Sequence, residues 1–326
     1  MDSSEVNIKS TGTTLACTLL LPINYGKFPC VVIAGGTMTH TRDGQLIDPG
    51  RSMPRRDNIK RLAERLAEAG YASIRWDKRG YGSTPASSTP ADNYDEARDL
   101  MAVMSFVRSD DRFSRLIVFG ESAGAYFACL AAKYGKQADA YAFLGALCSS
   151  DEELFLYNYG RLSHYAGLSE ENNKWAIETC AKALVMGRHY RGLIEAAKSG
   201  AETFHISDSL MDLDYRLDRM RHQMIDTPQS LFKYISAPAL VIHGELDMNV
   251  DPLDAATAES IMVRSGNRDV TRIMVPGADH SFQEAPQEFE TRLRERHSFD
   301  SFKRPYSEAF YNALICWLDD HCKRME

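Results

Sequence analysis

Short apolar runs alternate with amphipathic segments along the first half of the chain. Four mostly apolar runs are predicted to be buried strands, at residues 30–34, 71–76, 116–119 and 140–147. Helices are predicted between them, at residues 58–69, 95–107 and 123–134. Two antiparallel strands are expected before them, within residues 5–21. The alternation predicts an α/β fold: a mostly parallel sheet with helices on both faces.

The pattern changes in the middle of the chain. From about residue 149 to residue 236 no strand is expected, and four helices are predicted, at residues 153–165, 171–186, 191–198 and 211–222. Strands resume at 239–244 and 270–275, with helices at 252–264 and 306–318. We therefore expect a core domain formed by residues 1–148 and 237–326, with 149–236 as a helical cap insertion. The mixed-charge stretch 283–304 is expected to be exposed.

Composition adds limits to this picture. The chain has 326 residues, of which 44% are hydrophobic and 25% charged, as in an ordinary globular protein with a sizeable core. The net charge of −7 and the lack of a basic block argue against nucleic acid or an anionic membrane surface as a partner. No signal peptide, membrane-length apolar run or CxxC pair is seen, so we expect a reduced, cytoplasmic protein. The composition is compatible with a homo-oligomer.

One serine stands out for its local sequence. Residues 120–124 read Gly-Glu-Ser-Ala-Gly and lie between a predicted strand and a predicted alanine-rich helix. This is the pattern of a nucleophile elbow, in which a tight turn with small neighbours lifts the serine hydroxyl clear of the sheet. Such a pentapeptide arises by chance in roughly one sequence in ten, so its placement matters more than its occurrence. Ser122 is the candidate nucleophile.

A serine nucleophile needs a base, and the base needs a carboxylate that orients it. In a parallel sheet these groups lie in loops after the carboxyl ends of strands. Asp247 follows the strand at 239–244, and His280 follows the strand at 270–275. The nearby alternatives are His243 as base, and Glu245, Asp251 and Asp279 as carboxylate.

Two backbone N–H groups are expected to form an oxyanion hole. One is that of Ala123, directly after the nucleophile at the positive end of its helix. The other should come from the glycine loop at residues 35–37, with Thr37 as first choice and Gly36 as second.

These motifs together resemble the α/β-hydrolase-fold serine hydrolases over nearly the whole chain. The matching segments are residues 35–36, 77–83, 120–124, 243–252 and 277–282. The Arg-Asp-Gly sequence at residues 42–44 resembles a bacterial esterase branch, related to the dienelactone hydrolase and prolyl-oligopeptidase-like groups. The resemblance implies a Ser-Asp-His triad and an inserted helical cap over the site. No metal spacing or phosphate loop is seen, so no cofactor is expected.

We expect hydrolysis of a carboxylic ester of a small molecule through an acyl-enzyme. The same residues can cleave a thioester, amide or lactone, or transfer the acyl group to an alcohol. A third interpretation is a small-molecule receptor without catalysis. One of the four arginines after the glycine loop can hold an acidic or polar substrate group, unless all are solvated loop charges; they are Arg42, the first choice, and Arg51, Arg55 and Arg56. The candidate aromatic lining of the cap is Tyr157, Tyr159, Tyr165 and Trp175.

Overall fold

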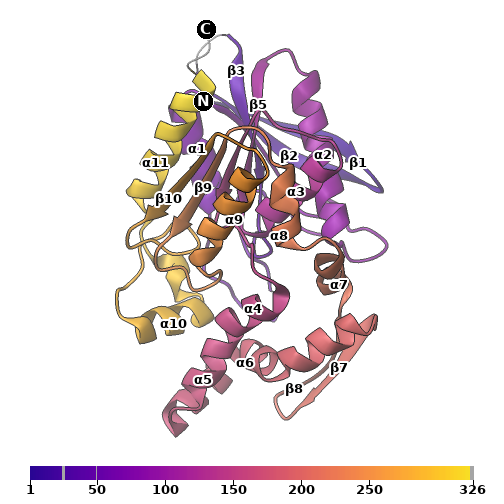
Figure 1. The fold of residues 1–326 in the computed structure, drawn as a ribbon, viewed down its shortest axis with the longest axis vertical. Helices are drawn as coiled ribbons and strands as arrows, with labels where there is room; N and C mark the ends of the chain where they lie inside the picture. The colour runs from indigo at the N-terminus through magenta and orange to yellow at the C-terminus, as the bar shows by residue number, and fades with distance from the viewer. Residues whose placement is uncertain (24–25, 49, 324–326) are drawn as a thin grey trace.

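The computed structural model of the protein shows a mixed sheet of eight strands within the residues it describes, 1–23, 26–48 and 50–323. The strand order is β1-β2-β4-β3-β5-β6-β9-β10 (Figure 1). β1 and β2 pair antiparallel, β2 joins β4 antiparallel, and the remaining neighbours are parallel. The strands are β1 (Asp2–Ser10), β2 (Thr13–Leu21), β3 (Phe28–Ala34), β4 (Ala72–Trp76), β5 (Phe113–Glu121), β6 (Ala140–Leu144), β9 (Ala239–Gly244) and β10 (Val270–Val275).

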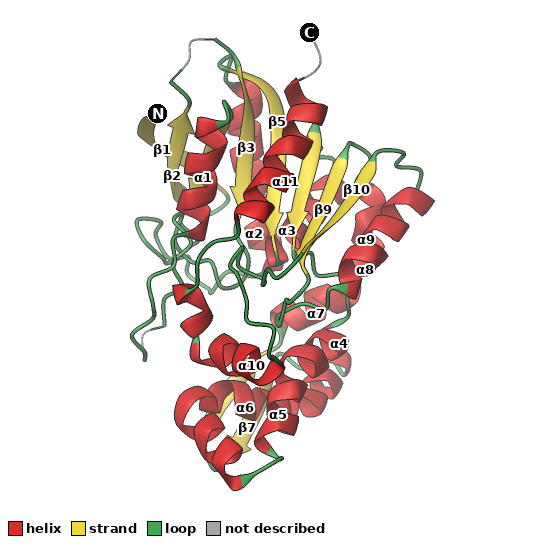
Figure 2. Cartoon of the chain, turned by 90° about the vertical axis from the view of Figure 1, so that its left-hand side faces the viewer, coloured by secondary structure: helices red, strands yellow, loops and turns green. Residues whose placement is uncertain are grey.

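Successive residues of the central strands face two separate hydrophobic clusters, as the two-residue period of a strand requires. In β3, Val32 belongs to one cluster, and Val31 and Ile33 belong to the other. The first cluster is covered by α2 (Asn93–Ser109), α3 (Ala123–Lys133) and α9 (Leu253–Arg264). The second is covered by α1 (Asn58–Glu68) and α11 (Glu308–Leu318), which lie in front of the sheet in Figure 2. The predicted mostly parallel sheet with helices on both faces is confirmed.

Most of the chain between β6 and β9 lies beyond the end of the sheet at which the parallel strands finish (Figures 1 and 2). Its last part returns to the sheet, where Leu231 and Phe232 join the first hydrophobic cluster. Its helices are α4 (Asp151–Phe155), α5 (Arg161–Ala166), α6 (Glu170–Lys198), α7 (Asp218–Ile225) and α8 (Pro228–Leu231). Shorter π and 3₁₀ turns occur here and near the C-terminus, as η1 (Leu156–Gly160), η2 (Phe232–Tyr234), η3 (Asp300–Lys303) and η4 (Asp319–Lys323). The helices predicted at 171–186 and 191–198 are one helix, α6, with a kink at Cys180.

The expectation of no strand in this segment is wrong. β7 (Thr203–Asp208) and β8 (Met211–Arg216) form an antiparallel hairpin where a helix at 211–222 was predicted. The physical reason is an alternation with period two: Leu213 faces apolar neighbours, while Asp212 and Asp214 are exposed. Only the end of the predicted helix is helical, as the start of α7.

The stretch 283–304 is also less exposed than expected. It contains α10 (Phe289–Ser298), of which Leu293 and His297 are buried. The charged residues 292 and 294–296 of this helix are partly buried, and the helix packs against α6. Among the described helices, none combines the length and the apolar character needed to cross a membrane.

Close contact between α3 and β3 determines where the elbow serine stands. Gly124 lies in the first turn of α3, and a Cβ added there would be 2.0 Å from the carbonyl oxygen of Ala34 at the end of β3. Backbone atoms cannot move aside for such a contact as a flexible side chain can. The helix therefore approaches the sheet this closely only because residue 124 has no side chain.

Gly124→Ala is expected to destabilise the fold by about 1–3 kcal/mol, because the added methyl group forces α3 away from β3. Gly167→Ala is the matched control, since Gly167 has a φ of −74° and its added Cβ would meet nothing closer than 3.4 Å. The control is expected to be neutral or slightly stabilising. Urea-induced unfolding of the two variants and the wild type measures the difference. Equal stability of both variants would contradict the prediction.

Candidate active site

Ser122 stands at the turn between β5 and α3 in a backbone conformation that residues with a side chain rarely adopt. Its φ is 55° and its ψ is −118°. The Ser122 N–H donates to the carbonyl oxygen of Leu144 in β6 at 2.8 Å. Strain of this kind persists only where the surroundings hold the backbone in place, and it is concentrated at functional sites. The elbow predicted from residues 120–124 is therefore present as a geometry.

Asp247 and His280 form a hydrogen-bonded pair in loops that follow β9 and β10. His280 Nδ1 lies 2.6 Å from Asp247 Oδ2. Asp247 Oδ1 accepts from the N–H groups of Asn249 at 2.6 Å and Val250 at 3.0 Å. Burial of Asp247 opposes its charge, but His280 and His243 hold the pKa of this carboxyl well below its usual range. Asp247 is therefore an ionised, oriented partner for the imidazole.

Ser122 and His280 line one cavity of about 260 Å³, together with Thr37 and Ala123. In the part of the chain that the structure describes, no hydrogen bond joins the Ser122 hydroxyl to His280. Hydrogen bonds of this kind are often long without substrate and shorten when substrate binds. The structure thus brings the predicted nucleophile, base and backbone donors to one cavity.

The alternative candidates have other surroundings. His243 Nε2 is 2.9 Å from Asp247 Oδ2, but the ring is fully buried and does not line the Ser122 cavity. Asp279 Oδ1 accepts from the N–H groups of Ser281 and Gln283 at 2.7 and 3.0 Å, and burial raises its pKa to about 6. Neither of these side chains bonds to the His280 ring, so Asp247 remains the orienting carboxylate.

The backbone of Gly36 is held at both its N–H and its carbonyl group. The Gly36 N–H donates to Glu121 Oε2 at 3.0 Å, which leaves it unavailable to an oxyanion in this conformation. The Gly36 carbonyl accepts from Lys78 Nζ at 2.8 Å. Because C=O and N–H point in opposite directions across a trans peptide, the Thr37 N–H points away from Lys78. Of the two predicted positions on this loop, Thr37 therefore fits and Gly36 does not.

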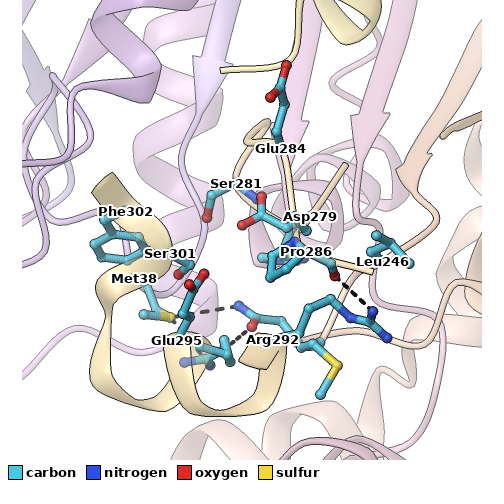
Figure 3. Close-up of a pocket in the computed structure, with 15 residues that line it drawn as sticks. Met38, Leu246, Asp279, Ser281, Glu284, Pro286, Arg292, Glu295, Ser301 and Phe302 are labelled. Atoms are coloured by element: carbon cyan, nitrogen blue, oxygen red, sulfur yellow. Dashed lines mark hydrogen bonds between the residues drawn. The ribbon is translucent and has the colours of Figure 1, made fainter. Parts of the chain in front are cut away.

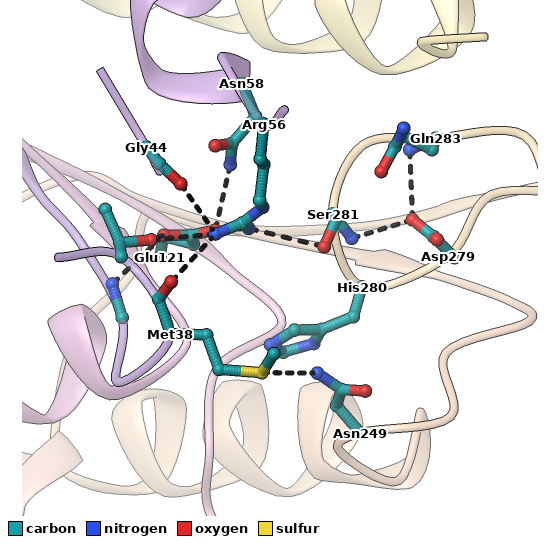
Figure 4. Close-up of polar contacts among 12 residues, drawn as sticks. Met38, Gly44, Arg56, Asn58, Glu121, Asn249, Asp279, His280, Ser281 and Gln283 are labelled. Carbon is teal, nitrogen blue, oxygen red and sulfur yellow. Dashed lines mark hydrogen bonds and ion pairs between the residues drawn. The ribbon is translucent and has the colours of Figure 1, made fainter. Parts of the chain in front are cut away.

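Glu121, directly before the nucleophile, is the centre of a buried network that the sequence did not reveal. Its carboxylate accepts from Thr39 Oγ1 at 2.5 Å and from Asn58 Nδ2 at 3.0 Å, and it forms an ion pair with Arg56 (Figure 4). Arg56 also donates to Ser281 Oγ at 3.3 Å, next to the candidate base. Burial opposes the charge of Glu121, but the Arg56 guanidinium and the donated hydrogen bonds lower its pKa to about 2.

Two of the predicted binding residues, Arg42 and Trp175, lie outside the Ser122 cavity. Arg42 does not reach the cavity, because its guanidinium is held by Asp77 Oδ2 at 3.1 and 2.9 Å and by Glu5. Trp175 packs edge-to-face on Tyr165 and does not line the cavity either. Both expectations are therefore wrong.

Tyr157 and Tyr159 differ in the cavity that they line. Tyr159 lines the Ser122 cavity, as expected. Tyr157 instead donates to the backbone oxygen of Asp247 at 2.7 Å and lines a separate, outer cavity of about 730 Å³.

Charged side chains line the cavity, and only Arg56 among them was a candidate from the sequence. Four are arginines, namely Arg56, Arg216, Arg219 and Arg296. Asp151 is a carboxylate whose Oδ2 is buried without a hydrogen-bond partner, and burial raises its pKa to about 7. No group of three His, Cys, Asp or Glu side chains suited to a metal ion occurs in residues 1–23, 26–48 and 50–323.

Comparison with known proteins identifies both a family and a fold. The family described as serine aminopeptidase, S33, matches residues 56–286. Est1E from Butyrivibrio proteoclasticus, solved with ferulic acid bound, is 16% identical with a TM-score of 0.55, covering 92% of this chain and 98% of that one. The α/β hydrolase GrgF from Penicillium sp. sh18 is 14% identical with a TM-score of 0.59, covering 99% and 100%. The Pyrococcus furiosus esterase Pf2001 is 14% identical with a TM-score of 0.58, covering 98% and 90%.

At these identities the solved structures bear on the fold, and they confirm the α/β-hydrolase fold that the motifs predicted. No curated protein matches the chain in sequence.

Glu121→Gln is expected to destabilise the protein by about 3–5 kcal/mol at pH 7, because it leaves the Arg56 guanidinium buried without a counter-charge. The pKa of Glu121 is lowered to about 2 in the folded protein from 4.5, so its contribution is present above pH 4.5 and is lost as the pH falls toward 2. The stability gap between wild type and variant should therefore narrow below pH 4.5.

Urea-induced unfolding at pH 7, 5, 4 and 3 measures this gap. The control is Glu64→Gln, which removes an exposed carboxylate 4.0 Å from Lys60 and is expected to change stability by less than about 1 kcal/mol. A gap that stays constant down to pH 3 would contradict the role given to the Glu121 charge.

Proposed function

The chain belongs to the family described as serine aminopeptidase, S33, a family of α/β-fold hydrolases, and we propose that this hydrolase cleaves a carboxylic ester of a small molecule through an acyl-enzyme. The observation that carries the proposal is the Asp247–His280 pair, at 2.6 Å, beside the same cavity as the strained Ser122. The solved structure named as an esterase, Pf2001 of Pyrococcus furiosus, supports the ester as the bond attacked.

The proposed roles follow from which atoms are already engaged. His280 Nδ1 faces Asp247, so Nε2 is the nitrogen left to accept the proton of Ser122. Ser122 Oγ attacks the acyl carbon, and His280 returns the proton to the leaving alcohol. Water, deprotonated by His280, then attacks the acyl-enzyme, and the acid leaves as Ser122 regains its proton. Asp247 stabilises the imidazolium that forms in each step.

The negative charge that develops on the acyl oxygen needs donors that are already in place. The N–H of Ala123, in the first turn of α3, is the first donor, and the helix dipole adds to it. The N–H of Thr37 is the second, since the Gly36 carbonyl is held by Lys78 and the Gly36 N–H by Glu121.

We treat residues 149–236 as a cap on a core formed by residues 1–148 and 237–326. The cavity supports this division, because residues 151–159 and 215–223 form one wall and loops after the parallel strands form the other. The substrate would therefore be a small acyl compound held between the two parts.

A peptide with a free amino terminus is the second candidate substrate, since the family description names an aminopeptidase. An ammonium group requires an anion, and Asp151 is a cavity carboxylate without a cationic partner in the described chain. Its pKa of about 7 means that it is only partly ionised at neutral pH. The same cavity holds four arginines, which disfavour a cationic substrate.

Ser122→Ala is expected to lower kcat for p-nitrophenyl hexanoate by a factor on the order of 10⁴ or more, because the covalent step is lost. Ser199→Ala, at an exposed helix end, is the control and should leave kcat unchanged. Covalent labelling by a fluorophosphonate probe should disappear in the first variant only. Activity retained within a few-fold in Ser122→Ala would overturn the assignment of the nucleophile.

A matched panel decides which acyl bond is preferred. We expect kcat/KM to be higher for the oxygen ester than for the thioester and anilide of the same acyl group, and for an aminoacyl p-nitroanilide. Faster turnover of the aminoacyl anilide would favour the aminopeptidase instead.

Lys78→Met is expected to lower kcat by about 10- to 100-fold with little change in KM, because the Gly36 carbonyl loses its charged donor and keeps only the Thr39 N–H, at 3.1 Å, so the Thr37 N–H is oriented less firmly. The substitution has a second effect, because it removes the ammonium group that lies 3.3 Å from the carboxylate of Glu96. The double variant Lys78→Met/Glu96→Gln removes that second effect and should show the same loss of kcat. Full activity in the double variant would contradict the positioning role.

A further inference from the structure

The four arginines of the Ser122 cavity differ in how their charge is compensated. Three have a carboxylate within ion-pair distance, namely Arg56 with Glu121, Arg216 with Asp218 and Arg219 with Glu96. Arg296, from α10, has none within the part of the chain that the structure describes. Its burial lowers the pKa of the guanidinium below the usual value.

The contacts of Arg296 engage one side of the guanidinium. Nε donates to the side-chain oxygen of Asn249. Nη2 lies 3.8 Å from the thioether sulfur of Met38, which is a weak acceptor. Asn249 is itself held, because its side-chain nitrogen also approaches the Met38 sulfur, at 3.9 Å (Figure 4). The edge formed by Nη1 and Nη2 therefore lacks a strong acceptor from the described residues.

The carboxylates nearest to this position are committed elsewhere. Both oxygens of Asp247 are bonded, to His280 on one side and to the backbone of Asn249 and Val250 on the other. Asp279 accepts from two backbone N–H groups of its own loop. Neither is within ion-pair distance of Arg296, so these carboxylates favour its charge only from farther away and the guanidinium has no direct counter-charge among the described residues.

Arg296 is partly buried, and a guanidinium that is partly withdrawn from water without a counter-ion costs the folded protein free energy, which a thioether contact does not offset. The arrangement is explained if the counter-ion arrives with the substrate. A carboxylate suits the free edge, since two parallel N–H groups match its two oxygens. Met38 directly follows Thr37, so such a carboxylate would bind beside the proposed oxyanion hole.

We propose that Arg296 binds a carboxylate group of the substrate and makes the enzyme selective for esters that carry a negative charge. This proposal rests on the proposed function for its kinetic test, but not for its binding test. The anion-binding role expected for Arg42 is thereby assigned to Arg296 in α10.

The chain offers a matched control on the same helix. Arg292 lies one turn before Arg296 and lines a neighbouring small cavity of about 30 Å³ (Figure 3), but not the Ser122 cavity. Its Nη1 donates to the backbone oxygens of Pro286 and Gln287 at 3.0 and 2.6 Å. Met38, Asn249 and Arg296 line both cavities, so they separate one from the other.

The kinetic test compares wild type, Arg296→Met and Arg292→Met on two pairs of esters. Mono-p-nitrophenyl adipate against p-nitrophenyl hexanoate places the charge on the acyl side. 4-Hexanoyloxybenzoate against its methyl ester places it on the alcohol side. Only the pair whose charge lies on the side of the ester that faces Arg296 should respond. In that pair, we expect the ratio of kcat/KM for the charged over the neutral ester to fall by about 10- to 100-fold in Arg296→Met. Arg292→Met should keep the wild-type ratio.

A ratio unchanged within three-fold in both pairs, or an equal fall in Arg292→Met, would overturn the proposal. The binding test needs no turnover: calorimetric titration with adipate should show binding to wild type and at least ten-fold weaker binding to Arg296→Met. If neither ester pair is turned over, the esterase proposal fails while this titration still decides the role of Arg296. Equal binding of adipate to wild type and Arg296→Met would overturn it, as would inorganic phosphate binding as tightly through Arg296.

Discussion

The buried carboxylate of Glu121 is the group on which the geometry of the site depends. A charge in this position is tolerated only when its oxygens are fully bonded, and here the donors come from separate parts of the chain. Gly36 belongs to the loop after β3, Arg56 to the approach to α1, and Glu121 itself to the end of β5. Because Ser122 follows Glu121 directly, the nucleophile and the glycine loop are positioned by the same carboxylate.

The network extends to the candidate base through a single side chain. Arg56 bonds both to Glu121 and to Ser281, the residue after His280. One guanidinium therefore connects the nucleophile loop with the base loop. A shift of the nucleophile loop would leave a buried charge unpaired, and a shift of the base loop would break the bond to Ser281. Preorganisation of this kind is what an oxyanion hole requires, since its donors must be in place before charge develops.

Much of this could be predicted from sequence, for identifiable reasons. Ser122, Asp247 and His280 each follow a strand that the apolar pattern revealed, and parallel strands bring their ends to one edge. Arg56 and Glu121 are 65 residues apart, and no local pattern records such a pairing. Arg42 was chosen for its nearness to the glycine loop, but the adjacency of β3 and β4 brings Asp77 within its reach.

Other segments differ from the prediction because a stronger local feature of the sequence indicated another structure. The alternation of Met211–Arg216 has the period of a strand, but its charged residues and its place among helices favoured a helix. The stretch around α10 is rich in charge, and only the fold shows which of its faces is covered. Arg296 could not be separated from Arg292 and Arg294 by composition alone, because what distinguishes it is its place in the Ser122 cavity without an ion-pair partner among the described residues.

Two arginines of the cavity wall, the buried Arg56 and the partly buried Arg296, illustrate opposite relations between charge and stability. Arg56 is compensated by Glu121 within the folded chain, so its charge contributes when the protein folds. The charge of Arg296 is not compensated in this way, and burial lowers its pKa. An anion that binds only the folded protein adds stability in proportion to its affinity and concentration. The folded chain gives Arg296 no direct counter-charge, so a carboxylate of the ligand can supply it. Because a neutral ligand cannot do so, the enzyme selects the charged one.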